Sequence, residues 1–230
     1  MTDQTTSLTN LDPKIKAFQT ELYAKYAIAN QQVTAGQIVF VGSSLMEIFP
    51  IEKWEKERAL NLPKHIYNRG VRATTTADLL AHLDVQIFDL APSKIFINIG
   101  SNDLGFNVPE TTFLNNYRKI LNQIQIRLPK TQIYVMKYYP MNAQADFSQS
   151  NPEKERAVHQ FNETRSNDQL SQANKKVADL AASLKIAYID ANAGLTDKNG
   201  YLKKELTFDG THLSPAGFEL VLNNLRPYFN

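Results

Sequence analysis

The chain repeats one pattern five times, in which a short run of apolar residues is followed by a longer segment with the period of a helix. An uninterrupted apolar run is typical of a strand covered on both faces, and alternating strands and helices build parallel sheets. We therefore expect an α/β fold, a three-layer α/β/α sandwich with a central five-stranded parallel sheet. The expected strands are Ile38–Val41, Ile66–Tyr67, Ile95–Ile99, Ile133–Met136 and Ile186–Ile189.

Apolar residues at three- and four-residue steps predict the helices between these strands. Two starts are marked by proline after a capping side chain, at Asn151-Pro152 and at Ser214-Pro215. In open α/β sheets ligands bind beyond the carboxyl ends of the strands, so the irregular segments 138–150 and 191–213 are expected to border the site. The expected helices cover residues 13–32, 79–90, 113–124, 151–184 and 215–225.

A length of 230 residues fits one domain over residues 1–230, in which residues 1–35 form an N-terminal helical extension. The hydrophobic share of 43% and the charged share of 21% exclude a disordered chain. A net charge of +2 with scattered basic residues argues against a nucleic-acid partner. The chain has no apolar run of membrane-spanning length and no leader features at its start, which predicts a cytoplasmic protein. The oligomeric state stays open, and a homo-oligomer is one alternative.

The chain contains no cysteine, which excludes disulfides, thiolate metal sites and a thiol nucleophile. Covalent catalysis must therefore use another side chain. The sequence has no phosphate-binding glycine-rich loop and no dinucleotide fingerprint. Asp209 and His212 would supply only two ligands to a metal ion, and no further cluster completes such a site. We expect no cofactor and no metal.

A serine hydroxyl is presented where the first strand meets a helix, in Gly42-Ser43-Ser44-Leu45. The unpaired N–H groups of a helix N-terminus would suit both a nucleophile and the oxyanion formed in its reaction. The alternative is that Ser43 or Ser44 only caps the helix.

A carboxylate precedes an imidazole by three residues in Asp209-Gly210-Thr211-His212, just before the last helix. Such a carboxylate can orient a histidine that acts as general base, and a structural turn is the alternative. Of the other histidines, His82 and His159 fall on predicted solvated helix faces, and His65 lies at the amino end of a strand. His212 remains as the candidate base by elimination.

Two further strand ends carry neutral hydrogen-bond donors, in Asn68-Arg69-Gly70 and in Gly100-Ser101-Asn102-Asp103. Backbone N–H groups and amide side chains of this kind can hold a developing oxyanion, although each motif alone also fits an ordinary turn. Because both follow strands of one parallel sheet, we expect them at the same edge.

These four blocks, in this order, resemble the SGNH or GDSL-like hydrolase superfamily over residues 38–217. The resemblance implies a flavodoxin-like SGNH hydrolase fold and a serine esterase that cleaves small O-acyl esters through an acyl-enzyme. It makes Ser44 the nucleophile, His212 the base and Asp209 its orienting partner. It also makes the Ser44 N–H, the Gly70 N–H and the Asn102 side chain the oxyanion hole.

The sequence departs from the family pattern in two places. Ser43 stands where the family has aspartate, which leaves Ser43 as a rival nucleophile. After Gly70, Arg72 stands in a segment where the family often has glycine, and it either reaches the cleft and favours an anionic substrate or lies solvated on the turn. A carbohydrate O-acetyl esterase and a non-catalytic binding module are the alternative functions.

The segment Tyr138-Tyr139-Pro140-Met141 and Phe147 are candidates for an apolar wall of the substrate site, which would favour an acyl or lipid group. Alternatively, these side chains complete the core beneath the loop. The sequence names no substrate-binding residue beyond these, and it leaves the acyl chain and the alcohol open.

Overall fold

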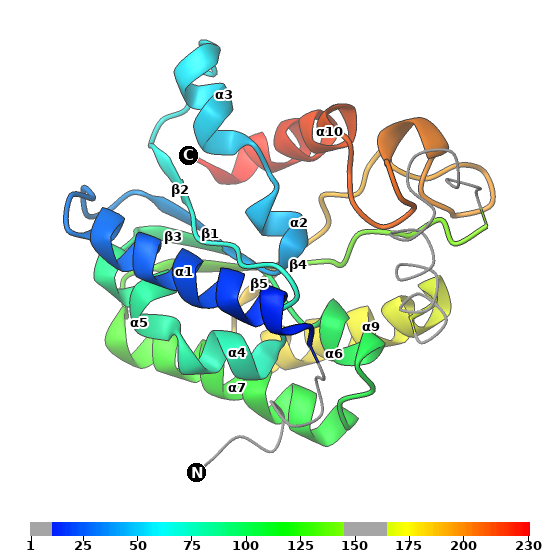
Figure 1. Cartoon of the computed structure of the whole chain (residues 1–230), viewed down its shortest axis with the longest axis horizontal. Helices are drawn as coiled ribbons and strands as arrows, with labels where there is room; N and C mark the ends of the chain where they lie inside the picture. Colours follow the sequence, from blue (N-terminus) through cyan, green and yellow to red (C-terminus); the bar gives the residue numbers. More distant parts are fainter. Residues whose placement is uncertain (1–10, 145–164) are drawn as a thin grey trace.

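The structure is a computed structural model that describes residues 11–144 and 165–230. Its centre is a sheet of five parallel strands in the order β2-β1-β3-β4-β5 (Figure 1). The expected parallel sheet is confirmed, because the five apolar runs form these strands with small shifts at their ends. The strands are β1 Ile38–Gly42, β2 Ile66–Asn68, β3 Lys94–Asn98, β4 Gln132–Met136 and β5 Ala187–Ile189.

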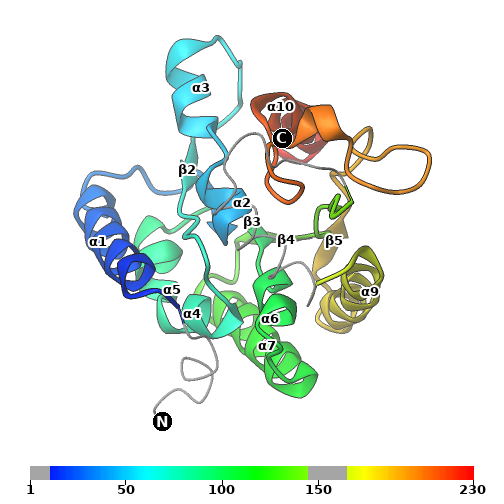
Figure 2. The same ribbon diagram turned by 45° about the vertical axis from the view of Figure 1, so that its right-hand side comes forward.

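Helices cover both faces of the sheet (Figures 1 and 2). Successive strand residues point to opposite faces, so Val39 and Val41 pack in one apolar cluster and Ile38 and Phe40 in another. The first face is covered by α4 Thr76–Ala81, α5 Leu83–Gln86, α7 Glu110–Arg127 and α9 Asn167–Ser183. The second face is covered by α2 Ser44–Glu47, α3 Ile51–Glu57 and α10 Pro215–Leu225. The three-layer sandwich is thus confirmed.

One of the expected helices is interrupted. The pattern over residues 79–90 forms α4, α5 and a 3-10 turn, Phe88–Leu90, instead of one helix. His82 lies at the first break, where its ring stacks on Tyr23 with centroids 3.8 Å apart. The prediction that His82 lies on a solvated helix face is therefore wrong, since this stacking half-buries the imidazole.

The helix expected over residues 151–184 is wrong in its extent. Its predicted start lies outside the described residues, and α9 begins only at Asn167. Ser166 has an extended backbone and caps the helix, because its hydroxyl accepts from the N–H of Gln169 while the Gln169 side chain accepts from the Ser166 N–H. Such a capping box starts a helix, and it prevents a continuous helix through this point.

The first helix, α1 Pro13–Asn30, is confirmed, and Ile15, Leu22 and Tyr26 are half-buried on its inner side. Its two buried residues are amides, Gln19 and Asn30, whereas Phe18 is 36% exposed. Helix α1 therefore docks through hydrogen bonds of buried amides in addition to half-buried apolar side chains. No helix in the described part of the chain is long and apolar enough to cross a membrane.

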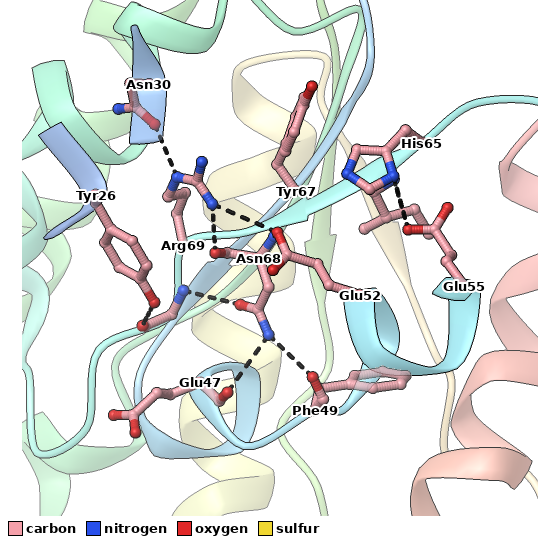
Figure 3. A network of polar contacts seen from close by, with 12 residues as sticks. Tyr26, Asn30, Glu47, Phe49, Glu52, Glu55, His65, Tyr67, Asn68 and Arg69 are labelled. Atoms are coloured by element: carbon pink, nitrogen blue, oxygen red, sulfur yellow. Dashed lines mark hydrogen bonds and ion pairs between the residues drawn. The ribbon is translucent and has the colours of Figure 1, made fainter. Parts of the chain in front are cut away.

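Strand β2 forms one edge of the sheet, and its outward N–H groups are occupied. Glu55 accepts from the N–H of Ile66 at 3.3 Å, and Glu52 accepts from the N–H of Asn68 at 3.0 Å. Both carboxylates come from α3, which lies beside this edge (Figure 3). Burial raises the pKa of Glu55 to about 7.

Two short 3-10 turns complete the fold, Lys204–Leu206 and Arg226–Tyr228. The first lies in the irregular segment 191–213, which also holds two isolated antiparallel bridges, Thr196 with Leu202 and Thr207 with Leu213. The second bridge closes the short loop 207–213 just before α10, at the carboxyl edge of the sheet.

Candidate active site

Ser44 is the first residue of α2, directly beyond the carboxyl end of β1. The turn into α2 needs glycine before it, since a Cβ on Gly42 would lie 2.1 Å from the backbone oxygen of Asn98. Among the described residues the Ser44 N–H has no acceptor, as the first N–H groups of a helix commonly lack one. The hydroxyl and the N–H of Ser44 are therefore both available to a ligand.

The Ser44 hydroxyl contacts His212, with Oγ 2.9 Å from Nε2. On the other side of the ring, Nδ1 lies 2.6 Å from Oδ2 of Asp209. Because an ionised carboxylate only accepts, Nδ1 carries the proton and Nε2 presents its lone pair to the Ser44 hydroxyl. The three predicted residues thus form one chain of hydrogen bonds.

The loop 207–213 holds Asp209 and His212 through its own residues. Oδ1 of Asp209 accepts from the N–H groups of Thr211 and His212 at 2.9 and 2.7 Å. The Thr207 hydroxyl accepts from the N–H of Gly210 and donates to the carbonyl of His212. Burial opposes ionisation of Asp209, but hydrogen bonds from His212 and Thr211 outweigh it and lower the pKa. Asp209 therefore stays a carboxylate next to the imidazole.

Gly70 differs from the expectation, because its N–H donates to Oδ1 of Asn68 at 2.9 Å. In this conformation that N–H is not available to a ligand. Gly70 is required for another reason, since a Cβ there would lie 2.2 Å from the backbone nitrogen of Glu47 in α2. The glycine lets the segment after β2 lie directly on the helix that begins with Ser44.

Beyond Gly70, the next two backbone N–H groups each donate to an acceptor, and the two after them do not in the described structure. The N–H of Val71 donates to the carbonyl of Gly42, and the N–H of Arg72 donates to the Glu47 carboxylate. The N–H groups of Ala73 and Thr74 have no acceptor among the described residues. Ala73 has a φ of +56°, a left-handed conformation that favours glycine. Ala73 is thus the first residue of the segment whose N–H is free for a ligand.

Asn102 lies in α6, Ser101–Gly105, beyond the carboxyl end of β3. Its Nδ2 donates one hydrogen to the carbonyl of Thr74 at 2.9 Å, which ties α6 to the segment that contains Ala73. The second hydrogen of the amide has no acceptor among the described residues. The neighbouring Asp103 is buried and accepts from both the N–H and the hydroxyl of Thr76, which fixes α6 against α4.

The geometry bears on the alternatives for the first block and for Arg72. Ser43 is 1% exposed, and the imidazole contacts Ser44 instead. Arg72 forms an ion pair with Glu47 and lies 4.4 Å from the ring of Phe18 in α1. Its charge is therefore neutralised on the turn, and nothing in the described structure supports an anion site there.

The predicted apolar wall belongs mainly to the core. Tyr138, Tyr139 and Met141 are each at most 3% exposed and pack in the two apolar clusters. Phe147 and His159 lie outside the described residues. His65 precedes β2 at its amino end, as expected, and pairs with Glu55. The described residues hold no group of three or more metal-ligating side chains.

Two residues that interact with the Asp209 block in the fold, Arg165 and Phe208, were not among the predicted site residues. Arg165 is buried, donates to the Ser101 hydroxyl at 3.4 Å, and has its pKa lowered to about 10 by burial although Asp209 opposes the shift. Phe208 is 53% exposed, and its ring lies parallel to the imidazole with centroids 5.7 Å apart. A phenylalanine beside the Asp209 block was the available signal for the second. No local pattern marks Arg165.

With this geometry in view, residues 40–220 match the model of the GDSL-like lipase/acylhydrolase family. A curated relative, the platelet-activating factor acetylhydrolase IB subunit alpha1 of Bos taurus, is 23% identical over 202 residues, which cover 86% of this chain and 77% of that protein. The human counterpart is equally similar over 200 residues.

Among solved structures, a protein from Streptococcus pneumonia described as a candidate platelet activating factor is 30% identical, with a TM-score of 0.81. The match covers 99% of this chain and all of that one. An acetylxylan esterase from Geobacillus stearothermophilus, solved as a catalytic serine-to-alanine mutant, is 14% identical with a TM-score of 0.62. That match covers 86% of this chain and 95% of the esterase.

Proposed function

Since the chain belongs to the GDSL-like lipase/acylhydrolase family, we propose that it is a serine esterase that cleaves small O-acyl esters through an acyl-enzyme on Ser44. The observation that carries the proposal is the chain of hydrogen bonds from Ser44 through His212 to Asp209. An isolated capping serine has no need of an oriented imidazole at 2.9 Å.

In the first half-reaction, His212 Nε2 takes the hydroxyl proton as Ser44 Oγ bonds to the ester carbonyl carbon. The carbonyl oxygen becomes an oxyanion, and Asp209 stabilises the imidazolium. When the tetrahedral intermediate collapses, the bond to the alcohol breaks and His212 protonates the departing oxygen. A water molecule then attacks the acyl-enzyme by the same route, which releases the acid and restores Ser44.

We propose three donors for the oxyanion: the N–H of Ser44, the N–H of Ala73 and the side chain of Asn102. This assignment replaces Gly70 by Ala73, because the Gly70 N–H already donates to Asn68. Neutral donors fixed before the reaction are the usual means of stabilising such charge. Each proposed donor has a free N–H hydrogen among the described contacts.

The test is covalent labelling with a fluorophosphonate, followed by mapping of the adduct. We expect modification of Ser44, and we expect Ser44→Ala and His212→Ala to abolish turnover of p-nitrophenyl acetate. Ser43→Ala, next to the nucleophile, is the matched control and should keep both properties. A folded protein without an adduct on Ser44 would refute the mechanism, and a protein without any turnover would favour a binding module.

Phe208 favours a carbohydrate O-acetyl ester as the second candidate. The alcohol leaves past His212, and the exposed Phe208 ring lies beside that imidazole. A flat apolar surface there suits an alcohol with a ring that can lie against it. The acetylxylan esterase among the structural relatives is named for a carbohydrate ester of this kind. Its variants with alanine in place of an aspartate or a histidine are described as catalytic mutants.

This candidate is tested by comparing Phe208→Ala with the unchanged protein on acetylated xylose and on ethyl acetate. We expect the variant to raise KM on the sugar ester several-fold and to leave the ethyl ester unchanged. Equal effects on both esters would remove the argument for a sugar alcohol, while the esterase proposal would stand.

A further inference from the structure

The segment 69–75, between β2 and α4, carries the proposed donor Ala73 but has no helix or strand of its own. An irregular backbone presents an N–H in a fixed direction only if other groups hold it. Part of that support comes from Arg72 N–H to Glu47 and from Asn102 to the Thr74 carbonyl. Neither contact fixes the peptide group between Arg72 and Ala73 itself.

That peptide group is held by α1. Nε2 of Gln19 donates to the carbonyl of Arg72 at 2.8 Å. The carbonyl of Arg72 and the N–H of Ala73 belong to one planar trans peptide, in which the two bonds point in opposite directions. A donor fixed on the carbonyl therefore directs the Ala73 N–H away from α1 and also polarises it.

A second side chain of the same helix acts two residues earlier. The hydroxyl of Tyr26 donates to the carbonyl of Gly70 at 2.7 Å, and the Arg69 guanidinium lies over the Tyr26 ring (Figure 3). Nε of Arg69 in turn donates to Oδ1 of Asn30 at 2.9 Å. Three positions along α1 thus contact three positions of the segment.

The burial of α1 agrees with this role. Gln19 and Asn30 are its buried residues, at 9% and 8% exposure, and both use their amides on backbone or on Arg69. Burying an amide is costly unless it is hydrogen-bonded, so the buried amides of α1 are expected to make specific contacts besides the half-buried Ile15 and Leu22. Phe18 and Ile28 stay exposed on this helix.

We propose that Gln19 is a positioning residue for the oxyanion donor Ala73, supported by Tyr26. The proposal rests on the proposed esterase function. It gives the N-terminal helical extension, which precedes the family match at residues 40–220, a part in the reaction. Binding of the substrate in its ground state does not need this contact, whereas stabilisation of the developing oxyanion does.

The test compares Gln19→Met, which removes the donor and keeps the length of the side chain, with Tyr26→Phe. Tyr23→Phe is the matched control, because it deletes a buried hydroxyl of the same helix that has no partner in the described structure. We expect Gln19→Met to lower kcat on p-nitrophenyl acetate about tenfold with KM within twofold. Binding of a trifluoromethyl ketone, which forms an oxyanion on the enzyme, should weaken in parallel.

Wild-type kcat in folded Gln19→Met and Tyr26→Phe would overturn the proposal and leave the esterase function intact. An equal loss in Tyr23→Phe would also overturn it, since that would be a general effect on α1. If Gln19→Met does not fold, Tyr26→Phe decides on the same criteria, with a smaller loss of kcat expected. Absence of turnover in the unchanged protein would instead refute the esterase function.

Discussion

The two segments that approach Ser44 are held in different ways. Loop 207–213 is held largely from within, by the Thr207 hydroxyl and the Asp209 carboxylate on N–H groups a few residues away, with one bond from outside, from the Asn142 N–H to the Gly210 carbonyl. Segment 69–75 is held by side chains of α1, α2 and α6, which are distant in the sequence. Local substitutions should therefore disable the first, whereas the second should respond to changes in several elements.

The largest effect is expected in the self-supported loop. Asp209→Asn replaces the acceptor of the Nδ1 proton by an amide, so the imidazole loses its productive tautomer, and kcat should fall by up to about 10⁴-fold. Steady-state kinetics on p-nitrophenyl acetate measures this. Asp197→Asn is the matched control, because Asp197 also accepts two backbone N–H groups in an irregular loop. A loss below tenfold in Asp209→Asn would mean that the loop orients His212 without the carboxylate.

The next effect concerns the segment held from outside. Asn102→Ala removes a proposed oxyanion donor and also the bond to the Thr74 carbonyl, so kcat should fall about 10²- to 10³-fold. Asn224→Ala removes an amide that holds the carbonyls of Ala191 and Ala193, outside both segments compared above, and should leave kcat unchanged. If kcat of Asn102→Ala falls less than fivefold, segment 69–75 does not depend on α6.

A pH effect on stability is expected from Asp103, which joins α6 to α4. Burial raises its pKa to about 7 in the folded protein, against hydrogen bonds from Thr76. The unfolded carboxyl titrates near 4, so the charged form is disfavoured on folding, and stability should be lost as pH rises from about 4 to about 7. Asp103→Asn removes this pH-dependent contribution to stability. In urea unfolding, the free energy of unfolding of the variant relative to the wild type should therefore be higher at pH 8 than at pH 5.

Parallel pH dependences of Asp103→Asn and the unchanged protein would contradict the raised pKa. Asp78→Asn offers a comparison at a neighbouring carboxylate that lies in the capping box of α4. Its own contribution should be a loss of stability at both pH values, because a cap is weakened whatever the charge of Asp103.

The smallest effect is expected at Ala73. Its φ of +56° strains an alanine but not a glycine, so Ala73→Gly should stabilise the protein by about 0.5–1 kcal/mol and keep kcat within twofold. Ala182→Gly in α9 is the control and should be destabilising by a similar amount. Thermal unfolding measures both. A destabilised Ala73→Gly would indicate that the segment needs the restriction of alanine in addition to its remote contacts.

The same contrast explains how far the sequence predicts the molecule. The strands and the residues Ser44, His212 and Asp209 are predictable from local patterns, because each apolar run and each turn is recognisable in the sequence by itself. No local pattern shows that the Gly70 N–H donates to Asn68. Ala73 is recognised as the free donor only when the partners of all neighbouring N–H groups are known, and these partners are set by the fold.

The errors on helices have equally specific causes. Apolar periodicity predicts α1 but not its buried amides Gln19 and Asn30, because the periodicity takes no account of polar side chains that dock by hydrogen bonds. The overlong helix before Leu184 was avoidable, since Ser166 and Gln169 have the spacing of a capping box in the sequence itself. Arg165 has no local signal, and its proximity to Ser101 exists only in the fold.

The carboxylates on β2 bear on how copies of this protein can meet. An exposed edge strand is a template for another chain, and continuous sheets across molecules begin there. With Glu52 and Glu55 on the outward N–H groups of Asn68 and Ile66, this edge offers few donors to an incoming strand. Growth of fibrous aggregates from this side of the sheet is thereby discouraged, and self-association there would have to use helix surfaces.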